Sequence, residues 1–492
     1  MSASEAARWQ AVIGLEVHAQ LRTSTKIFCS CPTSFGAAPN THVCPVCLGL
    51  PGALPVLNRA AVQLAVRTGL AVGCTIAPRS VFARKNYFYP DLPKGYQISQ
   101  AELPVCLDGH LDLELPGATT DSPTLQRHAR IQRIHLEEDA GKSIHGEGGA
   151  QTSAIDLNRA GTPLIEIVGH PDLRSADEAV AYLKELRAIL LCLGVCDGNM
   201  EEGSLRCDAN VSVHRPGEPL GTRCEIKNVN SFKSLRDAIA YEIDRQVGLL
   251  NDGQRVVQQT RLWSQERGRT EAMRSKEEAH DYRYFPDPDL PALVIDPGEV
   301  EILRLGLPEL PAARRARLRA EQGVTAQAAA WLVEEPERLR AFQAGVQGGA
   351  GEPAAWATFL MTQAIAALTR SSRVFAEVTT AARELARICD KWRTGGLSNR
   401  MLNDVLTQGF AGEEPLFAAL QTALTGVGEV VSDTAALEAT VDQVLAGLGP
   451  QVEKYRSGQV QLFGFFVGQV MRVLDGKGDA QAVNAILRRR LG

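Results

Sequence analysis

The chain has 492 residues and a formal net charge of −5, with 22% charged and 45% hydrophobic residues. At about 150 residues per domain, this length predicts about three domains. The composition is typical of a soluble globular protein and excludes a disordered, collagenous or coiled-coil chain. We expect no membrane span, because no run of about 18 uncharged apolar residues occurs. The 11 cysteines are an odd number, which favours reduced thiols and a cytoplasmic location over a disulfide framework.

The pattern of residue types changes twice along the chain. Residues 1–295 alternate in the manner of strands and end in the proline-dense string YFPDPDLP. From about residue 300 the pattern is helical, with a glycine-rich break at 345–351 and a second change at 409–412. We therefore predict an α+β chain: a large domain with a mixed or antiparallel sheet (1–295), an all-helical middle domain (296–407) and a small helical tail domain (408–492).

Two predicted strand regions carry polar side chains on one face. In residues 12–22, Glu16 and His18 lie side by side, because side chains two apart on a strand share a face. Residues 205–214 alternate in the same way, and a Pro/Gly turn leads from them into a second strand at 222–226. The polar rows of this hairpin comprise Arg206, Asp208, Asn210, Ser212, Arg223, Glu225 and Lys227. Such rows suit a metal–phosphate site, and a solvated outer face is the alternative.

Two further acidic segments stand out. Glu166 lies in the apolar string PLIEIV, where a carboxylate needs either an ionic partner such as Arg159 or a metal ion. In HLEEDAGKS, strand alternation places His135 and Glu137 on one face and Glu138 on the other. The GKS end of this string is not a P-loop, because that motif needs a glycine where leucine stands.

Four cysteines form two close pairs. Cys29 and Cys31 are followed, after twelve residues, by Cys44 and Cys47. Paired cysteines on short loops are typical of a tetrahedral structural Zn²⁺ site, and four free thiols are the alternative.

Long strings of the sequence resemble one family. The strings are GLEVHAQL, PGALPVLN, RKNYFYPDLPKGYQISQ, HLEEDAGKS, DLNRAGTPLIEIV, MEEGSLRCDANVSV, EIKNVNSF, DYRYFPDPDLP and FGFFVGQVM. They are similar, in this order, to the B subunits of the aspartyl/glutamyl-tRNA amidotransferase (the GatB family). The resemblance implies a catalytic cradle in the first domain, with a kinase-like step, and tRNA binding by the helical and tail domains.

The family's reaction gives the polar rows a purpose. ATP converts the side-chain carboxylate of Asp-tRNA(Asn) or Glu-tRNA(Gln) into an acyl phosphate, and ammonia displaces the phosphate to leave the amide. The resemblance implies Glu16, His18, Glu138 and Glu225 as catalytic Mg²⁺ ligands, with Glu166 and Asp208 as further candidates. It also implies that Lys85, Lys142, Arg206 and Lys227 contact ATP phosphates or the acceptor end, with Lys142 and Lys227 in the catalytic set. The choice of Glu138 over Glu137 comes from the resemblance alone.

The resemblance also implies partners. No glutaminase signature is present, so we expect an amidase A subunit and a small C subunit, in a heterotrimer that receives mischarged tRNA. We expect neither a membrane nor DNA as a partner. The flanks of FGFFVGQVM depart from the family pattern, which leaves Arg472, Lys477, Arg488, Arg489 and Arg490 as the candidate tRNA contacts. A solvated helix end is the alternative for the last three.

Two other functions compete with this interpretation. A non-catalytic tRNA-binding scaffold explains the helical domains but leaves the polar rows unused. A metal-dependent phosphotransferase acting on a small molecule explains the polar rows but gives the helical C-terminal part no role.

Overall fold

The computed structural model describes residues 9–100, 102–115, 125–145, 153–273, 282–428, 430 and 433–492. The chain forms two compact units, Met1–Pro311 and Ala312–Gly492. The first unit contains all the strands and the second is helical over its described residues, so the α+β prediction is confirmed. Among the described residues, no helix is long and apolar enough to cross a membrane.

A nine-stranded sheet forms the centre of the first unit, in the order β14-β13-β12-β11-β1-β10-β7-β6-β2. Its neighbours pair antiparallel, except β12 and β13, which are parallel, so the predicted mixed sheet is present. The strands are β1 (Gln10–Gln20), β2 (Thr75–Ile76), β6 (Cys106–Leu115), β7 (Leu125–Glu138), β10 (Pro163–Gly169), β11 (Leu205–His214), β12 (Cys224–Lys227), β13 (Thr260–Ser264) and β14 (Arg269–Ala272).

Seven short strands form three small sheets, in the orders β15-β4-β5, β16-β3 and β8-β9. They are β3 (Arg79–Ser80), β4 (Ala83–Asn86), β5 (Tyr96–Ser99), β8 (Lys142–His145), β9 (Ser153–Asp156), β15 (Phe285–Pro286) and β16 (Leu293–Val294). The helices of this unit are α2 (Arg59–Ala71), α3 (Ala176–Leu193), α4 (Phe232–Asn251) and α5 (Pro297–Leu305).

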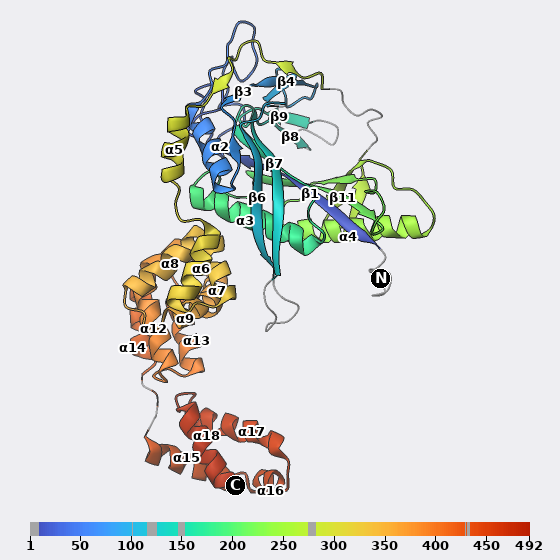
Figure 1. The fold of residues 1–492 in the computed structure, drawn as a ribbon. Coiled ribbons are helices and arrows are strands. Elements are labelled where there is room, and N and C mark those ends of the chain that lie inside the picture. Colours follow the sequence, from blue (N-terminus) through green and yellow to red (C-terminus); the bar gives the residue numbers. More distant parts are fainter. Residues whose placement is uncertain are drawn as a thin grey trace. The chain divides into compact units, whose positions relative to one another are not determined.

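Helices α3 and α4 cover one face of the large sheet, and the short sheets lie on the side of the other face (Figure 1). The residues of β1 that belong to the apolar core, such as Leu15 and Val17, alternate with Glu16 and His18. Because successive side chains on a strand point to opposite faces, this alternation directs the polar residues away from the helices. The local sequence supports the helices as well: Ser175 caps the N-terminus of α3 and Gly194, with φ of 65°, ends it.

The two units divide at Pro311, whereas the change of sequence pattern predicted a boundary at residue 295. The difference arises because α5 packs against α2, and Leu303 and Leu307 contact the core of the first unit. A helix that follows the proline-dense string therefore belongs to the first unit.

The second unit contains two apolar clusters. The first cluster draws on α6 (Pro311–Gln322), α7 (Ala326–Glu334), α8 (Pro336–Gln347), α9 (Pro353–Phe359), the π-helical turn η1 (Leu360–Ala364), α10 (Ile365–Thr369), α11 (Phe375–Thr380), α12 (Ala382–Arg393), α13 (Asn399–Phe410) and α14 (Leu416–Gly426). The second draws on α15 (Thr434–Ala446), α16 (Gly449–Arg456), the 3₁₀ turn η2 (Val460–Leu462), α17 (Phe463–Val473) and α18 (Ala480–Leu491).

Two helix ends in this unit bear on local predictions from the sequence. The predicted glycine-rich break is shorter than expected, because α8 continues through Gly345 to Gln347. Asp479 accepts hydrogen bonds from the backbone N–H groups of Gln481 and Ala482 at the start of α18, so the predicted N-cap is confirmed.

Candidate active site and cysteine cluster

The strand register brings most of the predicted site residues onto one sheet face. Glu16 lies opposite Asp208, and His18 lies opposite Arg206 on one side and Glu166 on the other. Glu166 in turn lies opposite His135. Directly opposite residues on neighbouring strands share a face. We call this surface the polar face; its residues are Glu16, His18, His135, Glu137, Glu166, Arg206, Asp208, Glu225 and Lys227.

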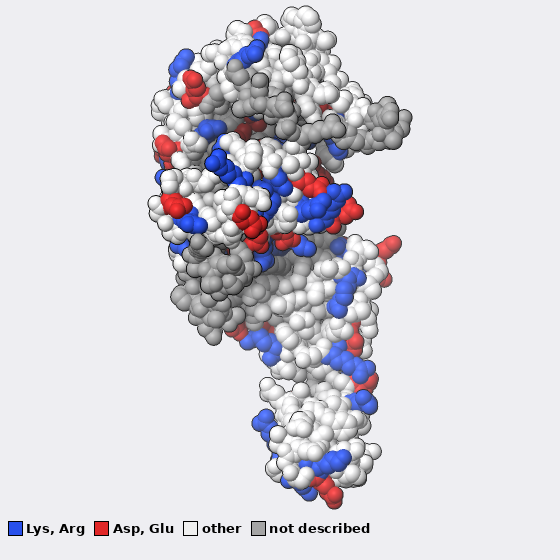
Figure 2. All heavy atoms as spheres, turned by 90° about the vertical axis from the view of Figure 1, so that its right-hand side faces the viewer, with Lys and Arg blue, Asp and Glu red and all other residues white. Residues whose placement is uncertain are grey.

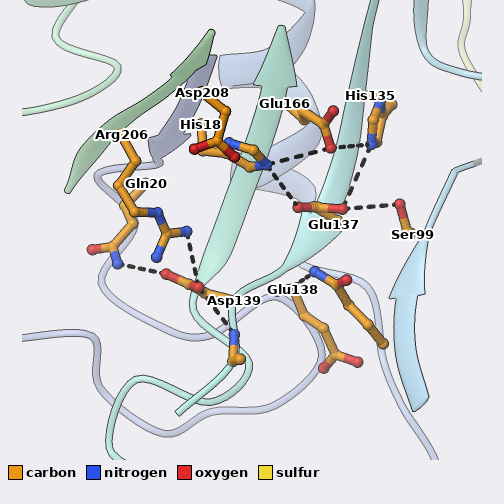
Figure 3. A network of polar contacts seen from close by, with 12 residues as sticks. His18, Gln20, Ser99, His135, Glu137, Glu138, Asp139, Glu166, Arg206 and Asp208 are labelled. Carbon is orange, nitrogen blue, oxygen red and sulfur yellow. Dashed lines mark hydrogen bonds and ion pairs between the residues drawn. The ribbon is translucent and has the colours of Figure 1, made fainter. Parts of the chain in front are cut away.

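Two histidines and two glutamates form a network at the β1–β10–β7 end of the polar face (Figure 3). His18 Nε2 lies 3.4 Å from Glu166 and 3.9 Å from Glu137, and His135 Nε2 lies 3.3 Å from Glu166 and 3.5 Å from Glu137. Ser99 Oγ donates a hydrogen bond to Glu137 (3.1 Å). Each carboxylate therefore contacts both imidazoles.

These contacts determine the charge of the network. Burial alone would lower the pKa of His135, but hydrogen bonds to Glu137 and Glu166 outweigh it and raise that pKa to about 9. The pKa of His18 is raised against the same burial effect, chiefly by Glu166. The pKa of Glu166 is held well below its usual range, because the two histidines outweigh its burial. At neutral pH His135 is thus an imidazolium, and the low pKa of Glu166 keeps that carboxylate ionised.

A second group of charges lies at the β1–β11–β12 end of the polar face. Lys227 Nζ lies 2.7 Å from Asp208 and 2.9 Å from Glu225. Asn210 donates a hydrogen bond to Glu16 (3.0 Å), and Thr260 donates one to Glu225 (2.8 Å). The lysine therefore contacts two of the three carboxylates at this end and offsets one of their charges.

Glu16 differs from the other carboxylates of the polar face. Burial raises its pKa, and the negative charges of Glu166, Glu225 and Asp208 raise it further. Among the described residues, no lysine or arginine lies within ion-pair distance of Glu16, although His18 lowers its pKa slightly. A carboxylate surrounded by other carboxylates suits a hard divalent cation with oxygen ligands, so the residues present fit Mg²⁺.

Asp139 anchors the edge of the polar face, directly after β7. It accepts a hydrogen bond from Gln20 (2.7 Å) and pairs with Arg206 (3.0 Å) and Arg159 (3.6 Å). The arginine partner proposed for Glu166 was therefore wrong: Arg159 pairs with Asp139, and Glu166 pairs with histidines. Arg206 is consequently held in place beside His18 by a buried carboxylate.

Three predicted site residues lie elsewhere. The Glu138 carboxylate points away from the network (Figure 3) and contacts Lys94 and the backbone N–H of Ile98. Lys142 begins β8 and is exposed. Lys85, on β4, lies over the Tyr282 ring at 4.8 Å; burial opposes its charge, but Glu137 and other neighbours outweigh burial and raise its pKa. Of the three, Lys85 is thus the one whose charge acts on the network.

Three members of this site were not predicted from the sequence: His135, Glu137 and Asp139. Alternation had placed His135 and Glu137 on one face but gave no reason to join them to Glu16. The missing information was the pairing of β7 with β10, which sets His135 opposite Glu166. Asp139 carried no sequence signal beyond its place in an acidic string.

The four cysteines of the predicted zinc site come together. Their sulfur atoms all lie within 4.8 Å of one another, and all four are free thiols. Cys31 and Cys47 are buried. A hydrogen bond from Cys29 lowers the pKa of Cys47 to about 4 against the effect of burial, with a further contribution from the charge of Lys26. Four thiols at this spacing fit a tetrahedral Zn²⁺ ion.

The candidate tRNA-binding residues of the tail differ in their contacts. Arg489 pairs with Glu438, and Arg490 pairs with both Glu438 and Asp442. Arg488 lies over the Phe463 ring at 5.8 Å. The side chains of Arg472 and Lys477 make no hydrogen bond or ion pair within the described part of the chain, and only their backbone groups are bonded. These two cations are therefore the most available to a ligand.

Two family models match most of the chain. The GatB/GatE catalytic domain model matches residues 11–301, and the GatB domain model matches residues 340–491. The chain belongs to the GatB family. Within this family, it is 54% identical over 493 residues to the B subunit of the aspartyl/glutamyl-tRNA(Asn/Gln) amidotransferase of Anaeromyxobacter dehalogenans (strain 2CP-C), covering 98% of this chain and 99% of the relative.

Two other relatives have the same name. The protein of Geobacter sulfurreducens (strain ATCC 51573 / DSM 12127 / PCA) is 51% identical and that of Geotalea daltonii (strain DSM 22248 / JCM 15807 / FRC-32) is 52% identical, each over 98% of this chain and 99% of the relative. The whole polar face and the four cysteines lie inside the segment matched by the GatB/GatE catalytic domain.

Proposed function

We propose that this chain is the B subunit of a tRNA-dependent amidotransferase and that its polar face activates the substrate carboxylate. The observation that supports this most directly is the gathering of Glu16, Asp208, Glu225 and Glu166 beside Lys227 and Arg206 on one sheet face. Family membership over nearly the full length supplies the reaction and the tRNA substrate. The enzyme class is a carbon–nitrogen ligase that uses ATP.

The reaction divides into two steps. An oxygen of the Asp or Glu side-chain carboxylate attacks the γ-phosphorus of ATP, the bond to the β-phosphate oxygen breaks, and ADP leaves. Ammonia then attacks the acyl phosphate carbon, inorganic phosphate leaves, and the nitrogen loses a proton to give the amide. The first step needs positioned cations around the phosphate oxygens rather than a covalent contribution from the protein.

Several residues of the polar face suit this first step. Glu16, Asp208 and Glu225 would hold Mg²⁺, which neutralises charge on phosphate oxygens when bound. Lys227 and Arg206 provide cations at one end of the face, and Lys85 provides one near Glu137. His135 is protonated at neutral pH, and both histidines lower the pKa of Glu137 and of Glu166. We propose Glu138 and Lys142 as supporting residues outside the polar face rather than as members of the Mg²⁺ site.

Partners and location follow from the same proposal. Because no glutaminase motif occurs in the sequence, an amidase A subunit supplies the ammonia and a small C subunit completes a cytoplasmic heterotrimer. Mischarged tRNA binds through the helical second unit, with Arg472 and Lys477 as the first candidates for phosphate contacts. On the face drawn in Figure 2, acidic and basic side chains lie interspersed over the first unit.

The proposed cysteine-bound ion is structural Zn²⁺, since four thiolates leave no open position for catalysis.

The proposal is tested in the assembled complex with Glu16→Gln. We expect ATP-dependent amidation of Asp-tRNA(Asn) and Glu-tRNA(Gln) to fall by at least about 10²-fold, as expected when a group that stabilises transition-state charge is lost. Glutaminase activity should be retained. The matched control is Glu271→Gln, which changes an exposed carboxylate paired with Arg267 and Arg269. Normal amidation by the Glu16 variant would favour the scaffold function instead.

A further inference from the structure

Lys26 is a fully buried lysine beside the four cysteines. Its side chain is among the largest that are wholly enclosed in the protein, with 0% exposure. The ammonium donates hydrogen bonds to the backbone carbonyl of His42 (2.7 Å) and to Cys47 Sγ (3.6 Å), and it lies 3.4 Å from the carbonyl oxygen of Leu157. Lys26 therefore contacts both the cysteine cluster and the segment that follows β9.

This lysine has no carboxylate to balance its charge. Among the residues that the structure describes, no aspartate or glutamate lies within ion-pair distance of Lys26. Glu138 lines the same cavity, but its carboxylate is bound by Lys94 and by the backbone N–H of Ile98. A buried ammonium without a carboxylate partner is strongly destabilising unless another negative charge compensates its desolvation.

We infer that Lys26 is the internal counter-charge of a metal-bound tetrathiolate and secures that metal in the fold. Four thiolates around a divalent ion carry two net negative charges, and Lys26 offsets one of them through its contact with Cys47. The inference rests on the zinc assignment proposed above and adds a residue that is not itself a ligand.

The same lysine connects the metal to the polar face. Next to Lys26, the backbone N–H of Ile27 donates to the carbonyl of Gly161 (2.9 Å), and the N–H of Gly161 donates to the carbonyl of Asp139 (2.8 Å). Asp139 in turn holds Arg206 on the polar face. Gly161 has a φ of +84°, and a Cβ there would lie 3.5 Å from both Cys47 and Lys26. Loss of metal should therefore loosen the Asp139–Arg206 pair as well as the cysteine loops.

The test compares Lys26→Met with wild type in the full-length chain, by zinc release to a chromophoric chelator and by thermal melting with and without Zn²⁺. We expect the variant to release zinc at least tenfold faster. Its metal-dependent rise in Tm should shrink, whereas its metal-free Tm should change much less. A merely structural role for Lys26 would lower both Tm values together.

Two further variants sharpen this result. Lys94→Met removes a half-buried lysine that lines the same cavity and is paired with Glu138, and should keep the wild-type zinc release rate. Lys26→Gln retains a hydrogen-bond donor without the charge, and should release zinc rapidly even if Lys26→Met fails to fold. Wild-type release rates in both Lys26 variants would overturn the inference. Wild-type protein that binds no zinc would overturn the zinc assignment itself.

Discussion

Replacement of Glu166 by glutamine should change how the stability of the protein depends on pH. Glu166 contacts both His18 and His135, and it is one of the two carboxylates that raise the pKa of His135 from 6.5 to about 9. Because the folded-state pKa lies above the unfolded one, the stabilisation is complete below pH 6.5 and is lost as the pH rises through about 9. At 1.36 kcal/mol per pKa unit, the raised pKa of wild-type His135 contributes about 3 kcal/mol to the free energy of unfolding.

The variant retains Glu137 as the partner of His135, but burial continues to oppose the charge in full, so less than half of this stabilisation should remain. Glu166→Gln should therefore destabilise the protein by at least roughly 2 kcal/mol more at pH 6 than at pH 9.5. Urea unfolding at a series of pH values measures this difference, and subtraction of wild type removes the contribution of the cysteines. Glu271→Gln is the control, because an exposed carboxylate with a lowered pKa does not titrate in this range. A pH-independent effect of Glu166→Gln would refute the assignment of a charged histidine network.

Three further experiments test separate parts of the structure. Gly161→Ala should lower the free energy of unfolding by about 1–2 kcal/mol, measured by urea denaturation, because the backbone φ of +84° disfavours a side chain; an unchanged value would exclude that strain. Phe466→Ala should lower the stability of the apolar cluster of α15–α18 by about 3–5 kcal/mol, since Phe466 is fully buried there. Limited proteolysis should then cut this tail while the first unit stays intact, and equal cleavage of wild type would contradict this. Arg472→Gln combined with Lys477→Gln should weaken tRNA binding and reduce the slope of log affinity against log salt by about 2, measured by filter binding. Arg490→Gln is the control: it removes an internal ion pair and should leave the slope unchanged.

The sequence predicted the strands of the polar face because alternation is a local property. The residues expected on one face of β1 and of β11 are on one face, and Glu16 and His18 do lie beside Asp208 and Arg206. Local patterns also predicted the four-cysteine cluster and the N-cap of α18.

Partners that depend on the order of strands could not be predicted in the same way. Strand β1 lies between β10 and β11, which are far from it in sequence, and β10 pairs with β7. This arrangement gives Glu166 two histidines instead of an arginine and brings Glu137 into the network. The burial of Lys26 beside the cysteines also could not be predicted, because it results from contacts between loops and produces no periodic pattern in the sequence.

If the polar face activates the side-chain carboxylate on tRNA, the complex should phosphorylate that carboxylate without any ammonia donor. The test incubates the complex with γ-labelled ATP and Asp-tRNA(Asn) or Glu-tRNA(Gln), in the absence of glutamine and ammonia, and follows label on the aminoacyl-tRNA. We expect labelled tRNA that loses its phosphate when ammonia is added, and no label with Glu16→Gln. Amidation of the same tRNA without any transfer of the label, under conditions that preserve acyl phosphates, would contradict this expectation.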